Sequence, residues 1–170
     1  CALVANTQVL LKYLKEIGKD YDDYTVFKDV LETALKIGAF SKTNGTQNYK
    51  NDDLMNEMLK KYGINKTATN VRFKNMPETV IENVDNDNPT VIHLPGHAVV
   101  GVGYCDAVIE YEIVRKKYIF WGEEIVEKKR LVRKMLLVND GWRDNVLSHT
   151  RYYPANKLTS LIDNAVTVCQ

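Results

Sequence analysis

The sequence predicts an α+β fold, with a helical front half packed on a C-terminal antiparallel β-sheet. Two observations predict it. Apolar residues recur at three- and four-residue spacing up to Val84, and after the Asp85–Pro89 run the period changes to two or to continuous β-branched stretches. The 170 residues contain no internal repeat and no linker long enough to divide them, so we expect a single domain, 1–170.

Four helices are predicted in the front half. The first three end at glycines, Gly18, Gly38 and Gly63, because glycine adopts the left-handed backbone conformation that closes many helices. The fourth begins at Pro77, whose ring suits a first helical turn. The helices are expected at 2–17, at 23–37 with a cap at Asp23 or Thr25, at 54–62 and at 77–84, with an exposed loop at 41–50.

The back half predicts a series of short strands, because β-branched and aromatic residues dominate it. Gly122 predicts a turn that joins two of these strands in a hairpin. The strands are expected at 90–94, 98–104, 108–114, 118–121 and 131–138, with a further short one at Tyr152 and Tyr153.

Composition excludes several classes of protein. The 23 basic and 22 acidic side chains leave a net charge of +1, and glutamates are interleaved with the basic runs at 115–117 and 128–134. We therefore expect a solvated hairpin face and no nucleic-acid partner. No apolar run approaches the ~20 residues that cross a bilayer, so we expect no membrane span. Three cysteines are too few for a disulfide scaffold, so Cys105 and Cys169 are expected as small buried thiols, with a disulfide between them as the alternative.

Cys1 stands at the N-terminal end of the first predicted helix. Unpaired amide donors and the positive end of the helix dipole favour thiolate over thiol there, so Cys1 is a candidate nucleophile. The alternative is a small helix cap. A chain that opens at cysteine also suggests a processed product, which leaves its compartment open, with a secreted or extracytoplasmic location as the first hypothesis.

His97 is the candidate base. It follows Gly96 and precedes an apolar run, which puts it at the start of a buried strand with its ring free to face a cleft. An imidazole has an unperturbed pKa of about 6.5 and can form an ion pair with a thiolate. The alternative is a hydrogen-bonded core histidine, which is also what we expect of His93 and His149.

Asn139 is the candidate orienting residue. It follows the strand predicted at 131–138 and is followed by Asp140, Gly141 and Trp142. An amide oxygen or carboxylate there can accept the imidazole N–H and fix its tautomer. The alternative is an ordinary Asn-Asp-Gly turn that closes a strand.

Three segments, Cys1–Ala5, Gly96–Tyr104 and Val138–Trp142, together resemble the papain-like cysteine peptidase superfamily, in particular its bacterial bacteriocin-processing and streptopain-like branches. The resemblance implies a papain-like fold with the cysteine helix packed against the sheet and a cleft between them. It implies hydrolysis of an amide bond through a thioester acyl-enzyme, without metal or organic cofactor. The implied partner is a peptide or protein substrate, which includes the chain's own propeptide.

Three departures from the family pattern qualify this resemblance. The family's oxyanion-donating glutamine, a few residues before the cysteine, has no counterpart, so the candidates are the Cys1 backbone nitrogen and the side chains of Asn6 and Gln8. The 42 residues from His97 to Asn139 exceed the usual separation, which indicates an inserted β-hairpin at 109–130. The orienting residue is Asn139 by the streptopain-like pattern, which we favour, and Asp140 by the bacteriocin-processing one.

Cleavage of a precursor before Cys1, by its own thiol or by another protease, would leave an α-amine of pKa about 7.7 to 8.0 beside the nucleophile as a second base. Two alternative functions stay open. One is a transglutaminase-like acyltransferase, which shares the residue order but usually has a shorter spacing. The other is an inactive papain-like module that binds peptides.

Overall fold

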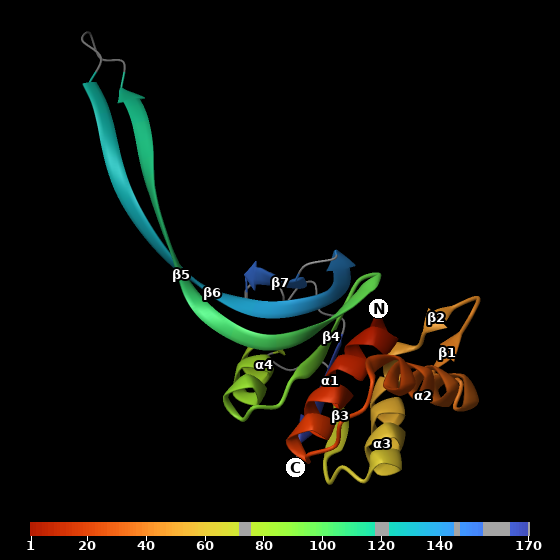
Figure 1. The fold of residues 1–170 in the computed structure, drawn as a ribbon. Helices are drawn as coiled ribbons and strands as arrows, with labels where there is room; N and C mark the ends of the chain where they lie inside the picture. Colours follow the sequence, from red (N-terminus) through yellow and green to blue (C-terminus); the bar gives the residue numbers. More distant parts are fainter. Residues whose placement is uncertain (72–75, 118–122, 145–146, 155–163, 170) are drawn as a thin grey trace.

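Figure 1 shows the computed structural model, which describes residues 1–71, 76–117, 123–144, 147–154 and 164–169. The helices are α1 (Ala2–Glu16), α2 (Asp23–Lys36), the 3-10 turn η1 (Asn48–Lys50), α3 (Asn51–Tyr62) and α4 (Met76–Asp85). The strands are β1 (Phe40–Ser41), β2 (Gly45–Thr46), β3 (Thr67–Val71), β4 (Thr90–Leu94), β5 (His97–Lys117), β6 (Glu123–Asp144), β7 (Leu147–Pro154) and β8 (Asn164–Cys169). The larger sheet is antiparallel with the strand order β3-β8-β4-β5-β6-β7, so the α+β class is confirmed.

The helix α1 is the centre of the molecule. It packs against α2 and α3 and against β4, β5 and β6 of the sheet. A helix covered on several sides must be apolar around most of its circumference, and buried residues account for most of α1 from Ala2 to Leu14. The arrangement puts the N-terminal end of this helix at the sheet.

The two faces of the sheet contribute to two separate cores. Val91 and Val100 are paired across β4 and β5 and pack in the cluster that contains α1, α2 and α3. Ile92 and Val99 are the neighbouring pair and pack in the cluster that contains α4. Since successive strand residues face opposite sides, one face of the sheet is the α1 face and the other is the α4 face.

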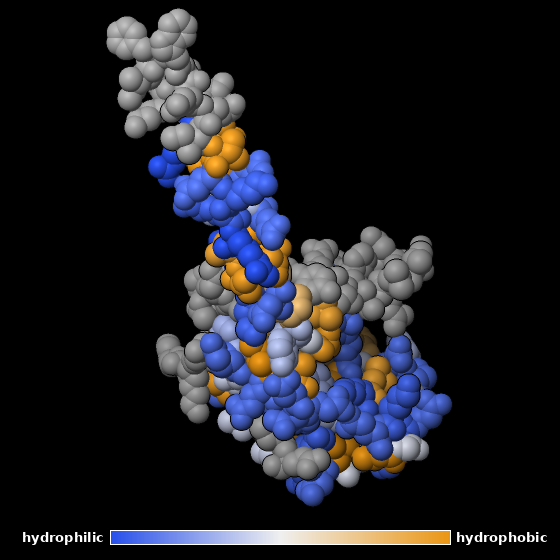
Figure 2. Space-filling model, turned by 90° about the vertical axis from the view of Figure 1, so that its left-hand side faces the viewer, coloured by the Kyte–Doolittle hydropathy of each residue, from blue (hydrophilic) through white to orange (hydrophobic). Residues whose placement is uncertain are grey.

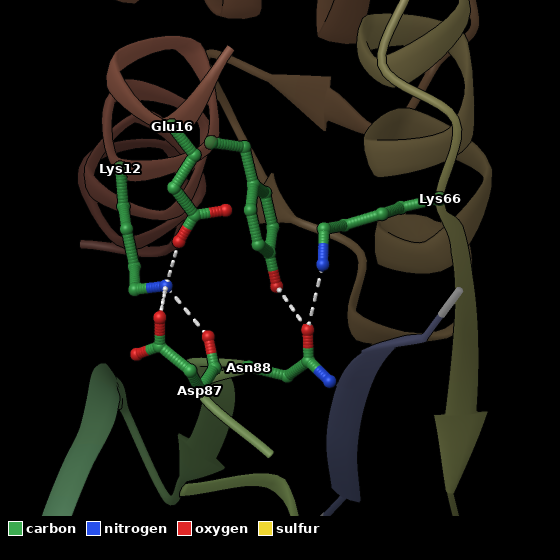
Figure 3. Close-up of polar contacts among 6 residues, drawn as sticks. Lys12, Glu16, Lys66, Asp87 and Asn88 are labelled. Atoms are coloured by element: carbon green, nitrogen blue, oxygen red, sulfur yellow. Dashed lines mark hydrogen bonds and ion pairs between the residues drawn. The ribbon is translucent and has the colours of Figure 1, made fainter.

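Polar contacts fasten the C-terminal half of α1 to the turn before β4 (Figure 3). Lys12 Nζ donates to Asp87 O at 2.6 Å, pairs with Asp87 Oδ2 at 3.0 Å and also pairs with Glu16. Asn88 Oδ1 accepts hydrogen bonds from Lys66 Nζ at 2.9 Å and from Tyr13 Oη at 3.4 Å. The helix therefore approaches the sheet in one fixed orientation.

The strands β5 and β6 leave the body as a long curved two-stranded arm, shown from two sides in Figures 1 and 2. We define the arm as Val102–Lys117 and Glu123–Lys134, where neither β4 nor β7 accompanies these strands in the described pairings. A register shift between Gly101 and Gly103 marks a β-bulge, which bends the strand at the base of the arm. The hairpin predicted at 109–130 is part of this longer one.

The four predicted helices and the strand at 90–94 are confirmed. The prediction of separate strands at 98–104 and 108–114 is wrong, because the ladder of β5 continues through Asp106. This residue is paired with Lys134 of β6 in the register, and its Oδ1 atom forms an ion pair with Lys134 Nζ at 3.1 Å. The short strand at Tyr152 and Tyr153 belongs to the longer β7, and the strand at 131–138 to the longer β6. The strands β3 and β8 were not predicted, and the strand predicted at 118–121 lies outside the described residues.

Among the described helices, none is long and apolar enough to cross a bilayer. Cys105 is an exposed, free thiol on the arm, so the prediction that it is buried is wrong, and so is its pairing in a disulfide. The reason is the length of β5, which carries Cys105 beyond the helices that would have covered it. The side chain of Cys169 lies outside the described residues.

Candidate active site at the N-terminal end of α1

Cys1 caps α1 with its backbone. Its carbonyl accepts the first helical hydrogen bond, from Ala5 N at 2.9 Å, and its side chain is exposed. Among the first ten residues only Cys1, Val4 and Gln8 are not fully buried. These positions share one side of the helix, because they are spaced by three and four residues. The thiol therefore stands at the end of the one partly open stripe on the first two turns of α1.

The segment that follows Asn139 lies against this stripe. Gly141 has a φ of +71°, and a β-carbon placed on it would lie 3.1 Å from Val4 Cγ1 and 3.7 Å from Gln8 Nε2. A side chain at this position would meet α1 and would also strain the backbone. Glycine thus allows the end of β6 to approach the stripe that begins with Cys1.

The strand register separates the two candidate orienting residues. Asn139 is paired with Val100 and so belongs to the α1 face. Asp140 follows it and belongs to the α4 face, with Val138. His97 belongs to the α4 face as well, since it lies two residues before Val99 on β5. By register, then, the imidazole shares a face with Asp140 and not with Asn139.

The surroundings of the two residues also differ. Asn139 Oδ1 accepts a hydrogen bond from Gly141 N at 3.1 Å, which is the local Asn-Asp-Gly turn anticipated as the alternative role. Asp140 is only 4% exposed, and its Oδ2 atom is buried. The Nε2 atom of His97 is buried too, although the residue as a whole is only half-buried.

In Figure 1 the marked N-terminus stands at the end of the sheet where β4 turns into β5, and β5 begins at His97. Within the described part of the chain, no hydrogen bond joins the Cys1 thiol to the His97 ring. The structure therefore brings Cys1 toward the end of β6 and leaves His97 at the start of β5 on the other face. The side chains of Trp142 and His149 lie outside the described residues.

A buried polar chain supports the first turn of α1. Asn6 Nδ2 donates to Ala2 O at 2.9 Å and to Asn51 Oδ1 at 2.6 Å, and Asn51 Nδ2 lies 3.0 Å from His93 Nε2. Because a backbone carbonyl can only accept, Asn6 presents its NH₂ group to Ala2, and Asn51 then presents its oxygen to Asn6 and its NH₂ group to His93. This assignment makes His93 Nε2 an acceptor, so that the ring proton lies on Nδ1.

This chain of hydrogen bonds excludes one candidate oxyanion donor, Asn6, and identifies a residue that the sequence motifs did not, Asn51. Asn6 is fully buried and committed to Ala2 and Asn51, so its side chain does not serve as the oxyanion donor. Gln8, on the open stripe, keeps that candidacy. Asn51 was missed, because as the first residue of α3 it looked like an ordinary helix flank, and only contacts across 45 and 42 residues reveal it. His93 is structural, as expected.

Among the described residues, no group of three His, Cys, Asp or Glu side chains is arranged to hold a metal ion. No protein-family model, no curated protein and no solved structure matches this chain.

Proposed function

We propose that the chain is a thiol hydrolase of the papain-like cysteine peptidase type, which cleaves an amide bond of a peptide or protein through a thioester on Cys1. The observation that carries the proposal is the approach of Gly141 to Val4 and Gln8. It means that the Asn-Asp-Gly segment and the candidate nucleophile lie at one end of the same helix stripe, although 138 positions separate Cys1 from Asn139 in the sequence.

The proposed reaction has two steps. The Cys1 thiolate attacks the scissile carbonyl carbon, and the C–N bond breaks as His97 gives its proton to the leaving amine, which leaves a thioester on Cys1. Water then gives a proton to His97 and attacks the thioester, which releases the acid and restores the thiolate. The proposal requires the His97 ring to reach the Cys1 thiol around the end of the sheet, where β5 begins.

In this proposal Asp140 orients the imidazole and Asn139 shapes the turn. Asp140 shares a face with His97 by register, and the Asn139 side-chain oxygen already accepts the Gly141 N–H at 3.1 Å. The Gln8 amide and the Cys1 backbone nitrogen are the candidate donors to the oxyanion. The sequence pattern favoured Asn139, so the two residues need a direct comparison.

Labelling with a thiol-directed peptidyl inhibitor tests the nucleophile. The structure supplies an internal control, because Cys105 is also an exposed free thiol but lies on the arm, beyond the reach of His97. We expect mass spectrometry to find the inhibitor on Cys1, with labelling lost in His97→Ala. Equal labelling of Cys1 and Cys105 would refute the proposed site.

Comparison of Asp140→Ala with Asn139→Ala tests the orienting residue. If Asp140 holds the imidazole, Asp140→Ala lowers the rate of Cys1 labelling by about 10²-fold or more, while Asn139→Ala has a smaller effect. The reverse order would restore Asn139. A labelled primary amine added to the assay distinguishes an acyltransferase, which would attach the amine to the acyl product, from a hydrolase.

A further inference from the structure

The arm concentrates exposed apolar side chains. Figure 2 shows hydrophobic patches that alternate with hydrophilic ones along it. A two-stranded ribbon cannot bury either of its faces by itself, and apolar clusters of this kind mark interaction sites. The large apolar residues exposed on the arm, at 38% to 55%, are Val102, Tyr104, Val108, Ile109, Tyr111, Val114, Val126 and Val132.

One edge of the arm is open for strand pairing. The described partners of β5 are β4, which reaches only to Gly101, and β6, which lies on the other side. Beyond Gly101 the backbone N–H and C=O groups on the outer side of β5 therefore have no described strand to pair with. We call the stretch Cys105–Ile113 of this strand the β5 edge. Such an edge is a template for an added strand.

The two rows of side chains on the β5 edge have different chemistry. One row is apolar at every position: Cys105, Ala107, Ile109, Tyr111 and Ile113. The other row contains three carboxylates: Asp106, Glu110 and Glu112. An added strand sets one of its own residues opposite each of these, so the best partner has apolar residues on one face and basic residues on the other.

The carboxylates remain available to such a partner. Asp106 and Glu112 form ion pairs with β6 lysines at 3.1 and 3.6 Å, but both side chains are more than half exposed. Glu110 stands opposite Arg130 in the register, yet within the described residues it forms no ion pair. Among the three carboxylates of the β5 edge, Glu110 is therefore the one without a described ion pair.

The same charges disfavour a second copy of this chain as the occupant. Antiparallel pairing of two β5 edges centred on Ile109 sets Asp106 of each copy opposite Glu112 of the other. Like charges directly opposite one another destabilise a sheet. The carboxylates thus admit a basic strand and repel the edge of another copy.

We propose that the β5 edge binds an extended peptide segment in which basic and apolar residues alternate, and that this segment adds a third strand to the arm. Binding itself does not require the proposed peptidase. Where the proposed function holds, the bound segment is a part of the substrate remote from the scissile bond, and β5 connects it to His97 at the other end of the same strand.

The test uses the full chain with Cys1→Ser, so that the probe is not cleaved, and fluorescein-labelled peptides of the length of the β5 edge. We expect a peptide of alternating lysine and valine to bind, and its glutamate–valine counterpart not to bind. Methylation of alternate backbone nitrogens on the outward edge of the first peptide should abolish binding, because it removes the strand hydrogen bonds. Equal binding of the acidic peptide would overturn the proposal.

Three variants give the matched comparison. Replacement of the Glu110 carboxylate should weaken binding in a graded way, severalfold for Glu110→Gln and about tenfold or more for Glu110→Lys. The glutamine variant adds no repulsion against Arg130 and so guards against misfolding of the arm. Glu57→Lys makes the same charge change at an exposed position of α3 and should bind as the parent does. Unchanged binding in Glu110→Lys would refute the site.

Three further outcomes separate this proposal from its alternatives. Sedimentation that shows a dimer, which Glu110→Lys strengthens, would assign the edge to a second copy and overturn the proposal. If the basic peptide binds but the inhibitor does not label Cys1, the proposed function is refuted and the docking site is supported. If the inhibitor labels Cys1 but the basic peptide does not bind, the docking site is refuted and the proposed function is supported.

Discussion

Asn51 is the middle member of the buried chain that joins Asn6 to His93, and nothing else described bridges these two side chains. We predict that Asn51→Ala lowers the free energy of unfolding by about 2–3 kcal/mol, because it removes two buried hydrogen bonds, one with Asn6 and one with His93. Urea unfolding measures the loss. Since the chain includes the Ala2 carbonyl, the rate of Cys1 labelling should fall as well.

Asn86→Ala is the matched control. Like Asn6 in the buried chain, Asn86 donates from its side chain to a backbone carbonyl four residues earlier, Glu82 O at 2.8 Å, but on the surface. We expect it to change the free energy of unfolding by no more than about 0.5 kcal/mol. Equal losses in the two variants would mean that the Asn51 chain contributes no more than a surface hydrogen bond.

The contact of Tyr62 with Asp29 predicts a pH dependence. Tyr62 Oη donates to Asp29 Oδ2 at 2.7 Å, and burial together with this hydrogen bond raises the pKa of Tyr62 well above its usual value. Because this pKa is higher in the folded state, the protonated Tyr62 hydroxyl contributes its full stabilisation below the unfolded pKa of about 10. That contribution to the free energy of unfolding is lost as the pH rises above this value.

Tyr62→Phe should therefore lower the free energy of unfolding by about 1 kcal/mol at pH 7 and reduce its decline above pH 10. Urea unfolding across this pH range gives the difference between the variant and the parent, which removes the contribution of the other tyrosines. Tyr49→Phe serves as the control, because Tyr49 is 58% exposed. A parent and a Tyr62→Phe variant that decline in parallel would contradict the prediction.

At the scale of elements, the packing of α4 on the sheet depends on Gly101. A β-carbon added there would lie 2.7 Å from Val80 Cγ1 and 3.2 Å from Ile92 Cδ1. We predict that Gly101→Ala lowers the free energy of unfolding by about 1–3 kcal/mol, because the clash forces α4 away from β5. Adding Val80→Ala removes the clashing methyl, so the double variant should be more stable than the sum of the single losses predicts. Strict additivity in urea unfolding would exclude this contact as the cause.

The elements also show which parts of the fold a sequence can predict. The helices and β4 follow from local patterns of apolar residues, and these predictions are confirmed. The strands β3 and β8 are short segments, and they form a ladder because residues 67–71 pair with residues 165–169, about a hundred positions away. Such pairing depends on long-range register, which no window of the sequence contains.

The candidate site divides in the same way. Cys1, His97 and the Asn139–Asp140 pair could be selected from motifs, because each motif is short and continuous in the sequence. The faces on which they lie could not, since these depend on the pairing of Asn139 with Val100. The β5 edge escaped notice for a related reason, as its rows become visible only once β5 is known to continue unbroken past Asp106.

For the molecule as a whole, the arm and the body should be separable. Neither core cluster contains a residue between Val102 and Met135, so the body does not depend on the arm for its packing. A shortened chain can be built by replacing 105–135 with Asn-Gly, which joins the paired residues Tyr104 and Leu136 through a two-residue hairpin turn.

We predict that the shortened chain keeps the free energy of unfolding of the parent to within about 1 kcal/mol, with a smaller urea m-value because less surface becomes exposed. It should still label at Cys1, since His97 and Asp140 are retained, and should lose the binding of the lysine–valine peptide. A shortened chain that is unfolded would show that the arm stabilises the body. One that still binds the basic peptide would move the docking site off the β5 edge and onto the body.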